Sequence, residues 1–182
     1  MRLFRKVGPE DPLIIAMAGV RLGLRVLILA GDDAEMPSDV AAKVGFSGQV
    51  VAVAAAEPAA ARLGERATRR GVLIEPAVLA PRLPYDDETF DFVIADDRPQ
   101  PAGQRTTDAV LAEAFRLLRV GGRLVALRAV PRRGLLSART AVALEGGAPA
   151  SLVEALGRIG FRAAREIATR ERIVFIEAAR PR

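Results

Sequence analysis

The chain has 182 residues, 51% of them hydrophobic, so we expect one well-buried core and a single domain over residues 1–182. It contains no cysteine and no histidine, which excludes disulfides, thiolate nucleophiles, the usual zinc ligand sets and any catalytic couple that uses histidine. The net charge of +5 comes mainly from arginines spread along the chain, and aromatic residues make up only 4%, so no nucleic-acid partner is expected.

The first residues, 1–12, are predicted to form an N-terminal arm. They begin with basic residues and lead into a short apolar run, but Glu10, Asp11 and Pro12 interrupt the pattern that a signal peptide needs. No apolar run reaches the roughly 18 residues of a membrane-spanning helix. The sequence therefore predicts a cytoplasmic protein without a membrane span.

Five short apolar runs bounded by Gly, Pro or Asp are predicted to be strands. They lie at 25–30, 49–54, 72–77, 90–95 and 122–130. Continuous apolar runs of this kind are typical of parallel strands that are covered by helices on both faces. The spacers have helical composition, with predicted starts at Ser38 or Asp39, Glu57–Pro58, and Thr107 or Asp108, and predicted ends at Gly45, Gly71 and Gly121. This alternation predicts a doubly wound α/β fold.

The end of the chain has a different pattern. Residues 131–150 are rich in Gly, Ala and Arg and are predicted to form a loop, and 151–161 reads as a helix. Two strand-like runs then meet around Thr169 to Arg172. Because a parallel pair needs a long crossover, these two strands must be antiparallel.

The stretch RVLILAGDDAE, residues 25–35, places a loop directly after the first predicted strand. A nucleotide-type cofactor usually meets an α/β protein at such a loop. Asp32 and Asp33 fit two interpretations, which do not exclude each other: they cap the following helix, or they line a cofactor site. They disfavour a phosphate-bearing dinucleotide, whose Gly-x-Gly-x-x-Gly loop is also missing.

Three stretches together carry a resemblance to a known family: VGFSGQVVAVAAAEP (44–58), LPYDDETFDFVIADD (83–97) and FRLLRVGGRLVAL (115–127). They resemble the class I S-adenosylmethionine-dependent methyltransferases, in the branch called type 11 or ubiquinone/menaquinone-methyltransferase-like. The resemblance implies a Rossmann-like seven-stranded sheet in the order 3-2-1-4-5-7-6, with the last strand antiparallel and helices on both faces.

The resemblance also implies S-adenosylmethionine as the cofactor, bound over the first loop. The positions that it assigns to the cofactor site are Ala30, Gly31, Asp32, Asp33, Ala54, Ala55, Leu79, Ala80 and Ala95. Several residues that are usual in the family are replaced. Ile28, Ala30, Asp32 and Ala34 stand at the positions of an acid and three glycines. Ala54 stands where an acid grips the ribose, and Leu79 where an acid contacts the adenine, while Glu57 and Asp32 lie near enough in sequence to compensate.

Asp96 and Asp97 follow the fourth predicted strand and are the candidate catalytic residues, as a general base or as groups that orient the acceptor. The alternative for both is a solvated turn. Tyr85 is expected to pack at the rim of the sheet. The arginines at 128, 132, 133 and 139 either attract an anionic substrate or solvate a loop. No metal site is expected, because no converging set of oxygen ligands is evident.

Two functions remain open from the sequence. In the first, the protein is an enzyme that transfers the methyl group of S-adenosylmethionine to a small molecule, with proximity and orientation supplying most of the rate. In the second, it is a non-catalytic relative that binds another ligand or a protein partner.

Overall fold

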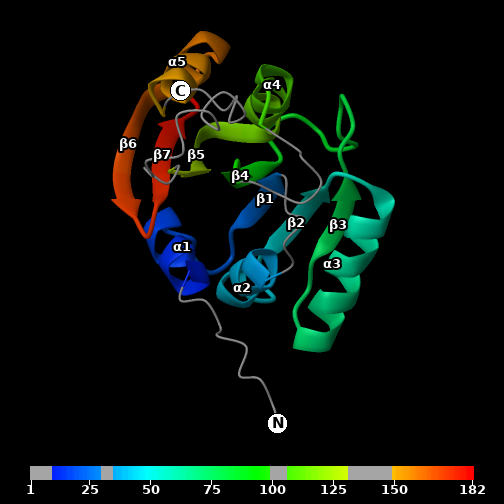
Figure 1. Cartoon of the computed structure of the whole chain (residues 1–182). Coiled ribbons are helices and arrows are strands. Elements are labelled where there is room, and N and C mark those ends of the chain that lie inside the picture. The colour runs from blue at the N-terminus through cyan, green and yellow to red at the C-terminus, as the bar shows by residue number, and fades with distance from the viewer. Residues whose placement is uncertain (1–9, 30–34, 99–105, 131–148) are drawn as a thin grey trace.

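The computed structural model describes residues 10–29, 35–98, 106–130 and 149–182, which form one mixed sheet with helices on both faces (Figure 1). The helices are α1 (Glu10–Ala18), α2 (Glu35–Val44), α3 (Glu57–Arg70), α4 (Asp108–Leu117) and α5 (Pro149–Ile159). The strands are β1 (Arg25–Leu29), β2 (Gln49–Ala54), β3 (Glu75–Val78), β4 (Phe90–Asp96), β5 (Leu118–Ala129), β6 (Arg162–Arg170) and β7 (Ile173–Ala179). No helix within these ranges is long and apolar enough to cross a membrane.

The strand order is β3-β2-β1-β4-β5-β7-β6, which confirms the predicted topology. Strands β1 to β5 run parallel, whereas β7 runs antiparallel to both β5 and β6. The order in which successive strands are added to the sheet reverses at β1: β2 and β3 lie on one side of it, and β4 lies on the other. In open α/β sheets this reversal marks the crevice in which ligands bind.

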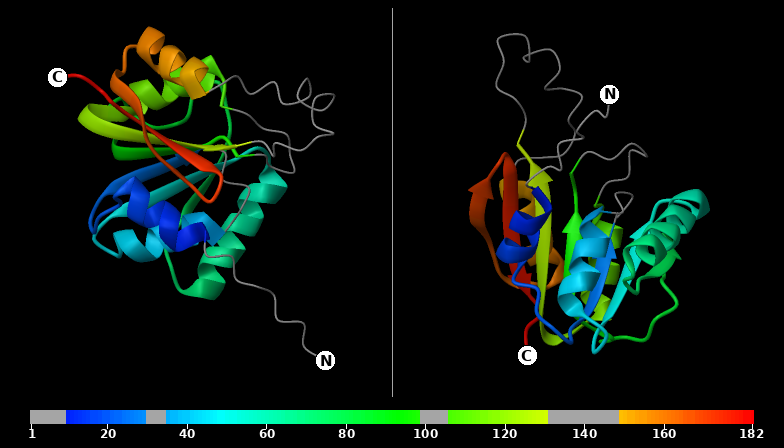
Figure 2. Two further views of the ribbon diagram at one scale, coloured as in Figure 1. Left: turned by 60° about the vertical axis from the view of Figure 1, so that its left-hand side comes forward. Right: turned by 90° about the horizontal axis from the view of Figure 1, so that it is seen from below.

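Apolar side chains alternate across the strands and build one core on each face of the sheet. In the left panel of Figure 2 the sheet is seen nearly edge-on, with α1, α2 and α3 on one side and α4 and α5 on the other. Val26 and Ile28 of β1 contribute to the core under α1 to α3, whereas Leu27 and Leu29 contribute to the core under α4 and α5. Both faces of the parallel strands are therefore buried, as their continuous apolar runs predicted.

The third strand was predicted too early. It was expected at 72–77, but β3 covers Glu75–Val78, where residue 75 pairs with Val51 of β2. Gly71 ends α3 in the left-handed conformation, with φ of 67°. The apolar residues Val72 and Ile74 pack partly against the core before strand pairing begins.

Four helix boundaries also differ from the prediction. Helix α2 begins at Glu35 and not at Ser38 or Asp39, because Glu35 starts the first turn and forms an ion pair with Arg66 of α3. The glycine at 121 does not end a helix: α4 ends at Leu117 and Gly121 lies inside β5. Residues 149 and 150, expected in a loop, begin α5, and α1 takes up residues 10–12 of the predicted arm. The rest of the predicted loop, 131–148, lies outside the described residues.

Other boundaries are confirmed. Helix α3 begins at Glu57, and the Thr107 side chain caps α4 by accepting a hydrogen bond from the Val110 amide at 3.3 Å. The two final strands meet at Glu171 and Arg172, which both have positive φ, and they are antiparallel as expected.

Strands β3 and β6 form the two edges of the sheet. Strand β3 has four residues and includes Pro76, which has no amide hydrogen to offer a further strand. Strand β6 is longer and mostly exposed, but its pairing with β7 shifts register twice, and Ala163 has a φ of 54°. Both edges are thus irregular or short.

Candidate cofactor and substrate cleft

The carboxyl ends of β1, β2 and β4 meet at one edge of the sheet, where strand order reverses. Leu29 of β1 lies between Val53 of β2 and Ala95 of β4 in the register of the sheet. The residues that end β2 and approach the end of β4, Ala54 and Ala95, are fully buried and carry only methyl side chains. Side chains of this size add little bulk at the strand ends, the position at which ligands of open α/β sheets bind.

The structure brings together some of the predicted cofactor-site residues. Leu79 and Ala80 directly follow β3, and the Leu79 amide donates to the Ala54 carbonyl at 2.8 Å, which joins the ends of β2 and β3. Ala55 follows Ala54 and is half-buried. The predicted loop positions Ala30, Gly31, Asp32 and Asp33 lie outside the described residues.

Helix α3 begins directly beside these residues. Ala56 is its N-cap and offers no side-chain oxygen, so no side chain caps the first turn. Glu57 is the next residue, and its side chain is exposed. It is the first carboxylate after Ala54, three residues beyond the end of β2.

Asp96, one of the two candidate catalytic residues, is fully buried at the end of β4. Arg98 donates to both carboxylate oxygens, from Nε to Oδ1 at 2.8 Å and from Nη2 to Oδ2 at 2.8 Å. The Arg98 backbone amide also donates to Oδ1 at 3.1 Å. A forked ion pair of this geometry fixes the direction of the carboxylate. It does not resemble the solvated turn that was the alternative.

Asp97, the second candidate, is also nearly buried and also pairs with an arginine. Arg128 of β5 donates from Nε and Nη2 to Oδ2 at 2.9 and 2.8 Å. The Thr106 amide donates to Oδ1 at 3.0 Å, and the Asp97 amide donates to the Leu127 carbonyl at 2.8 Å. Asp97 therefore ties the end of β4 to β5 and to the residue that precedes the cap of α4.

These two ion pairs change the chemistry expected of the site. Each candidate carboxylate accepts hydrogen bonds from an arginine, so neither is placed as an isolated general base. Side chains alternate along a strand, so Asp96 lies on the face of Ile94 and Asp97 on the opposite face. The two pairs thus brace the end of β4 from both sides.

Arg128, predicted either to attract an anion or to solvate a loop, instead pairs with Asp97. The other arginines of that prediction, residues 132, 133 and 139, lie outside the described ranges.

The sequence offered a signal for these pairs that the prediction did not use. Arg98 stands two residues after Asp96, a spacing that lets a side chain return to the carboxylate within one turn. The partner of Asp97 is 31 residues away, and only the parallel pairing of β4 with β5 reveals it.

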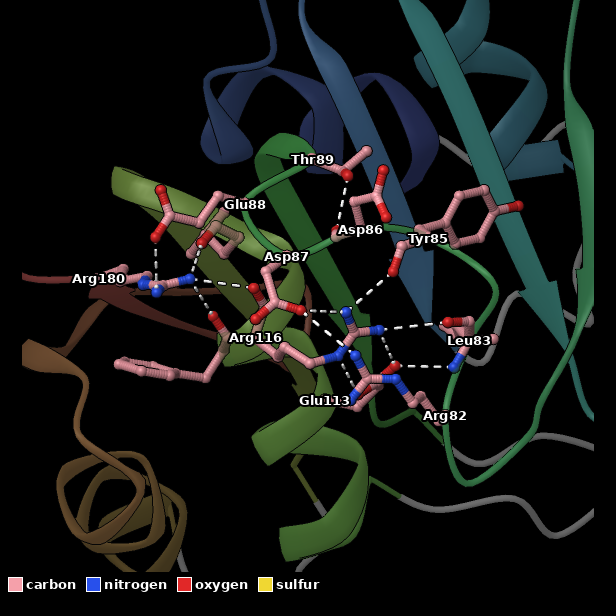
Figure 3. A network of polar contacts seen from close by, with 12 residues as sticks. Arg82, Leu83, Tyr85, Asp86, Asp87, Glu88, Thr89, Glu113, Arg116 and Arg180 are labelled. Carbon is pink, nitrogen blue, oxygen red and sulfur yellow. Dashed lines mark hydrogen bonds and ion pairs between the residues drawn. The ribbon is translucent and has the colours of Figure 1, made fainter.

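The loop between β3 and β4 leads away from the cleft and is held by one arginine of α4 (Figure 3). Arg116 donates to the carbonyls of Leu83 and Tyr85 at 3.2 and 2.9 Å, to Asp87 at 2.6 Å and to Glu113 at 2.6 Å. Glu113 in turn accepts the Leu83 amide at 2.7 Å. The Arg116 side chain therefore fixes this loop to α4.

Arg180, near the end of the chain, extends this network (Figure 3). Its Nη1 donates to three backbone carbonyls at the end of α4, those of Phe115, Arg116 and Leu118, and its Nη2 pairs with Glu88 at 3.0 Å. The carbonyls of Phe115 and Arg116 are among the last of the helix and lack intrahelical donors, and that of Leu118 belongs to the first residue of β5. The chain end is thereby fixed to the α4–β5 junction.

Tyr85 lies where the prediction placed it, at the rim of the sheet. Its ring packs edge-on against Phe90 with centroids 5.4 Å apart, and its hydroxyl donates to Glu75 at 2.7 Å. Burial is the main cause that raises the pKa of Tyr85 above its ordinary value, and the hydrogen bond to Glu75 and its charge act in the same direction. Tyr85 therefore stays protonated and is a structural residue.

The Arg116 network predicts an acid-dependent loss of stability. The hydrogen bond from Arg116 lowers the pKa of Glu113 below its ordinary value of 4.5, against the opposing effect of burial. A lowered pKa in the folded state contributes stability above the unfolded pKa and loses it as the pH falls through the folded pKa. We expect Glu113→Gln to lower the melting temperature at pH 7, with the difference from the wild type shrinking below about pH 4.5.

Melting curves by circular dichroism from pH 7 to pH 3 measure this effect. Glu65→Gln is the matched control, because Glu65 lies on the exposed surface of α3 and has no hydrogen bond or ion pair within the described residues. A Glu113→Gln difference that stays constant across the range would show that the network does not titrate in this way.

Comparison with known proteins finds methyltransferases both by family model and by sequence identity. A family model described as "Methyltransferase domain" matches residues 34–126. The chain is 31% identical over 117 residues to the ubiquinone/menaquinone biosynthesis C-methyltransferase UbiE of Idiomarina loihiensis, and 35% identical over 115 residues to that of Bordetella parapertussis. Each alignment covers 62% of this chain but only 45% and 43% of the relative, so the chain matches less than half of the length of these relatives.

Solved structures show the same fold at lower identity. A SAM dependent methyltransferase from Aquifex aeolicus superposes with a TM-score of 0.78 at 17% identity, over 93% of this chain and 89% of that one. The [4+2]-cyclase SpnF superposes with a TM-score of 0.71 at 16% identity, over 94% and 80%. The second similarity shows that this fold also serves proteins named for other reactions.

Proposed function

Because the chain belongs to the methyltransferase domain family of class I S-adenosylmethionine-dependent enzymes, we propose that it transfers the methyl group of S-adenosylmethionine to a small molecule. The observation that carries the proposal is the reversal of strand order at β1, where the small residue Ala54 ends β2 and the small residue Ala95 stands one position before the end of β4. Ligands of open α/β sheets bind at that position.

We propose that the cofactor lies over this edge, where the side chains are small. Ala54, Ala55 and Ala95 add little bulk above the strand ends, and Leu79 and Ala80 border the same edge. No carboxylate stands at 54 or 79 to accept hydrogen bonds from the ribose or the adenine. We therefore propose that backbone groups hold the nucleoside here, with Glu57 as the nearest carboxylate after β2, and that the affinity is lower than two such acids would give.

When bound, S-adenosylmethionine supplies an electrophilic methyl group on a cationic sulfur. The protein's contribution is to orient an acceptor in line with that group. We propose that the Asp96–Arg98 and Asp97–Arg128 pairs keep the end of β4 rigid, so that acceptor and cofactor meet in a fixed geometry. Orientation of this kind supplies a large share of the rate in bimolecular transfers.

Isothermal titration of S-adenosylmethionine and S-adenosylhomocysteine into the full chain tests the proposal. We expect dissociation constants in the micromolar range, corresponding to roughly 6–8 kcal/mol of binding free energy. The absence of both binding heat and a rise in melting temperature at millimolar cofactor would contradict the proposal and would favour a non-catalytic role.

Acceptors are then screened with the radiolabelled methyl group. Quinone precursors are the first class, because the curated relatives are named as C-methyltransferases of ubiquinone/menaquinone biosynthesis.

A further inference from the structure

Three large apolar side chains are exposed at the amino ends of neighbouring parallel strands, opposite the carboxyl ends where the candidate cofactor site lies. We call this side of the sheet its amino edge. The three side chains are Leu22, Phe46 and Leu73, exposed by 73%, 83% and 72%, and we name them the amino-edge row. They belong to the loops that precede β1, β2 and β3, which are adjacent strands. At about 4.8 Å between neighbouring strands the row spans roughly 10 Å.

The loops that carry the row are fixed to one another. The Gly23 amide donates to the Val44 carbonyl at 2.9 Å, and the Gln49 amide donates to the Leu24 carbonyl at 3.1 Å. The Leu22 Cδ1 atom lies so close to Gly45 that a Cβ there would stand 2.8 Å from it. Leu22 therefore lies against the residue that precedes Phe46, and the right panel of Figure 2 shows these two loops together at the lower edge.

Each member of the row has a cation shortly before it in the sequence. Arg21 precedes Leu22, Lys43 precedes Phe46 by three residues, and Arg69 precedes Leu73 by four. All three cations are exposed, and none has a hydrogen bond or ion pair within the ranges that the structure describes. Lys43 and Arg69 stand in the last turns of α2 and α3, where the helix dipole favours a cation, and these helix ends lead into the loops that carry Phe46 and Leu73.

The same edge carries a groove between α1 and α2. It has a volume of about 670 Å³ and is lined by the apolar residues Ile15 and Val20 together with Asp39 and Lys43. Lys43 thus borders both the groove and the amino-edge row. Apolar side chains and cations, with one carboxylate, Asp39, thus lie at this end of the sheet, and apolar residues combined with cations suit a face that meets an anionic interface.

We propose that the amino-edge row docks the protein on an anionic lipid bilayer, with Leu22, Phe46 and Leu73 entering the headgroup region and the three cations contacting lipid phosphates. A second copy of the chain fits this face less well. Twofold packing would bring the cations of one copy to those of the other, and like charges repel at short range. The proposal is independent of methyl transfer, because the row lies at the opposite edge from the cleft.

Co-sedimentation with vesicles of phosphatidylcholine alone, and of phosphatidylcholine mixed with phosphatidylglycerol, tests the proposal on the full chain. We expect binding to the anionic vesicles and a marked decrease at 0.5 M salt, near which screening lengths shrink to roughly 4 Å. Phe46→Ser should weaken partitioning by about tenfold or more, because the phenyl group is exposed in the free protein and becomes buried only when the protein binds the bilayer.

Charge reversal separates a local contact from attraction by the overall positive charge. Lys43→Glu changes the charge by two units. At about fivefold for each unit of charge at the membrane surface, it should weaken partitioning by roughly 30-fold. Arg165→Glu is the control for net charge: it makes the same change of charge on β6, where the Arg165 side chain is 69% exposed and pairs with Glu177 at 3.6 Å, and should change partitioning by less than about threefold.

Three results would overturn the proposal. They are equal binding to neutral and anionic vesicles, equal losses from Lys43→Glu and Arg165→Glu, and a dimer in sedimentation velocity that Phe46→Ser dissolves while vesicle binding stays undetectable. The last result would assign the row to a second copy of the chain. Melting temperatures of the variants serve as the folding check, because Phe46 is exposed and contributes little to the core.

Discussion

A carboxylate placed at position 54 tightens S-adenosylmethionine binding by roughly 10- to 150-fold, which corresponds to about 1.5–3 kcal/mol for hydrogen bonds to a charged group. Ala54 ends β2 at the reversal of strand order, where the family resemblance places the acid that grips the ribose. Ala54→Asp restores that acid on a strand end that β1 and the Leu79 amide already hold in place. Isothermal titration of wild type and variant measures the gain.

The controls separate charge from bulk. Ala54→Val adds side-chain volume without an acceptor and should weaken binding, and Ala55→Asp places the same charge one residue away. Because Ala54 has no exposed surface, Ala54→Asp should lower the melting temperature of the ligand-free protein and recover part of the loss on binding. A folded Ala54→Asp variant with unchanged affinity would show that the ribose is not bound beside β2.

Arg98→Met lowers the free energy of unfolding by about 3–5 kcal/mol, because it leaves the fully buried Asp96 carboxylate without its forked partner. Removing one member of a buried pair costs far more than removing both. We therefore expect the double variant Asp96→Asn/Arg98→Met to recover much of the loss. Urea denaturation, with linear extrapolation to water, gives the three free energies.

A surface ion pair provides the comparison. Arg158 of α5 pairs with Asp108 of α4 at 3.1 Å, and both side chains are more than 60% exposed. Arg158→Met should cost less than about 1 kcal/mol. If Arg98→Met costs no more than Arg158→Met, then the Asp96 pair does not brace the end of β4, and the proposed role in orienting the acceptor loses its basis.

The strands were predictable wherever burial is symmetrical. Runs such as 49–54 and 90–95 are apolar throughout because helices cover both faces, and the structure places β2 and β4 within one residue of those bounds. Strand β3 was harder, since its edge position leaves it half-exposed and Glu75–Val78 includes a charged residue and a proline. Its apolar neighbours, residues 72–74, gave the stronger signal although they only lead into it.

The helix ends show where local signals are ambiguous. Thr107 is a cap in both sequence and structure, because its hydroxyl has a free amide to accept from. Ser38 also has a hydroxyl side chain but lies one turn inside α2, where tertiary contacts of Glu35 with α3 set the start. Gly121 resembled a helix end but belongs to β5, where its amide donates to the Arg180 carbonyl 59 residues later.

The place of Asp96 and Asp97 in the fold was predictable, and their contacts were less so. Asp96 and Asp97 lie at the end of the fourth strand as the order of elements required. Their hydrogen-bond partners are Arg98 and Arg128, and the second of these becomes a neighbour only through the pairing of β4 with β5. Composition and spacing along the chain do not contain that contact.

The shape of strand β6 bears on how the protein behaves in concentrated solution. Its two register shifts and the left-handed backbone at Ala163 interrupt the row of amides and carbonyls that a further strand would need, and charged side chains line it. With Pro76 in the opposite edge strand, folded molecules offer poor templates for fibril growth at either end of the sheet. Aggregation of this protein should therefore begin from opened chains, and its storage life should depend on the rate of unfolding.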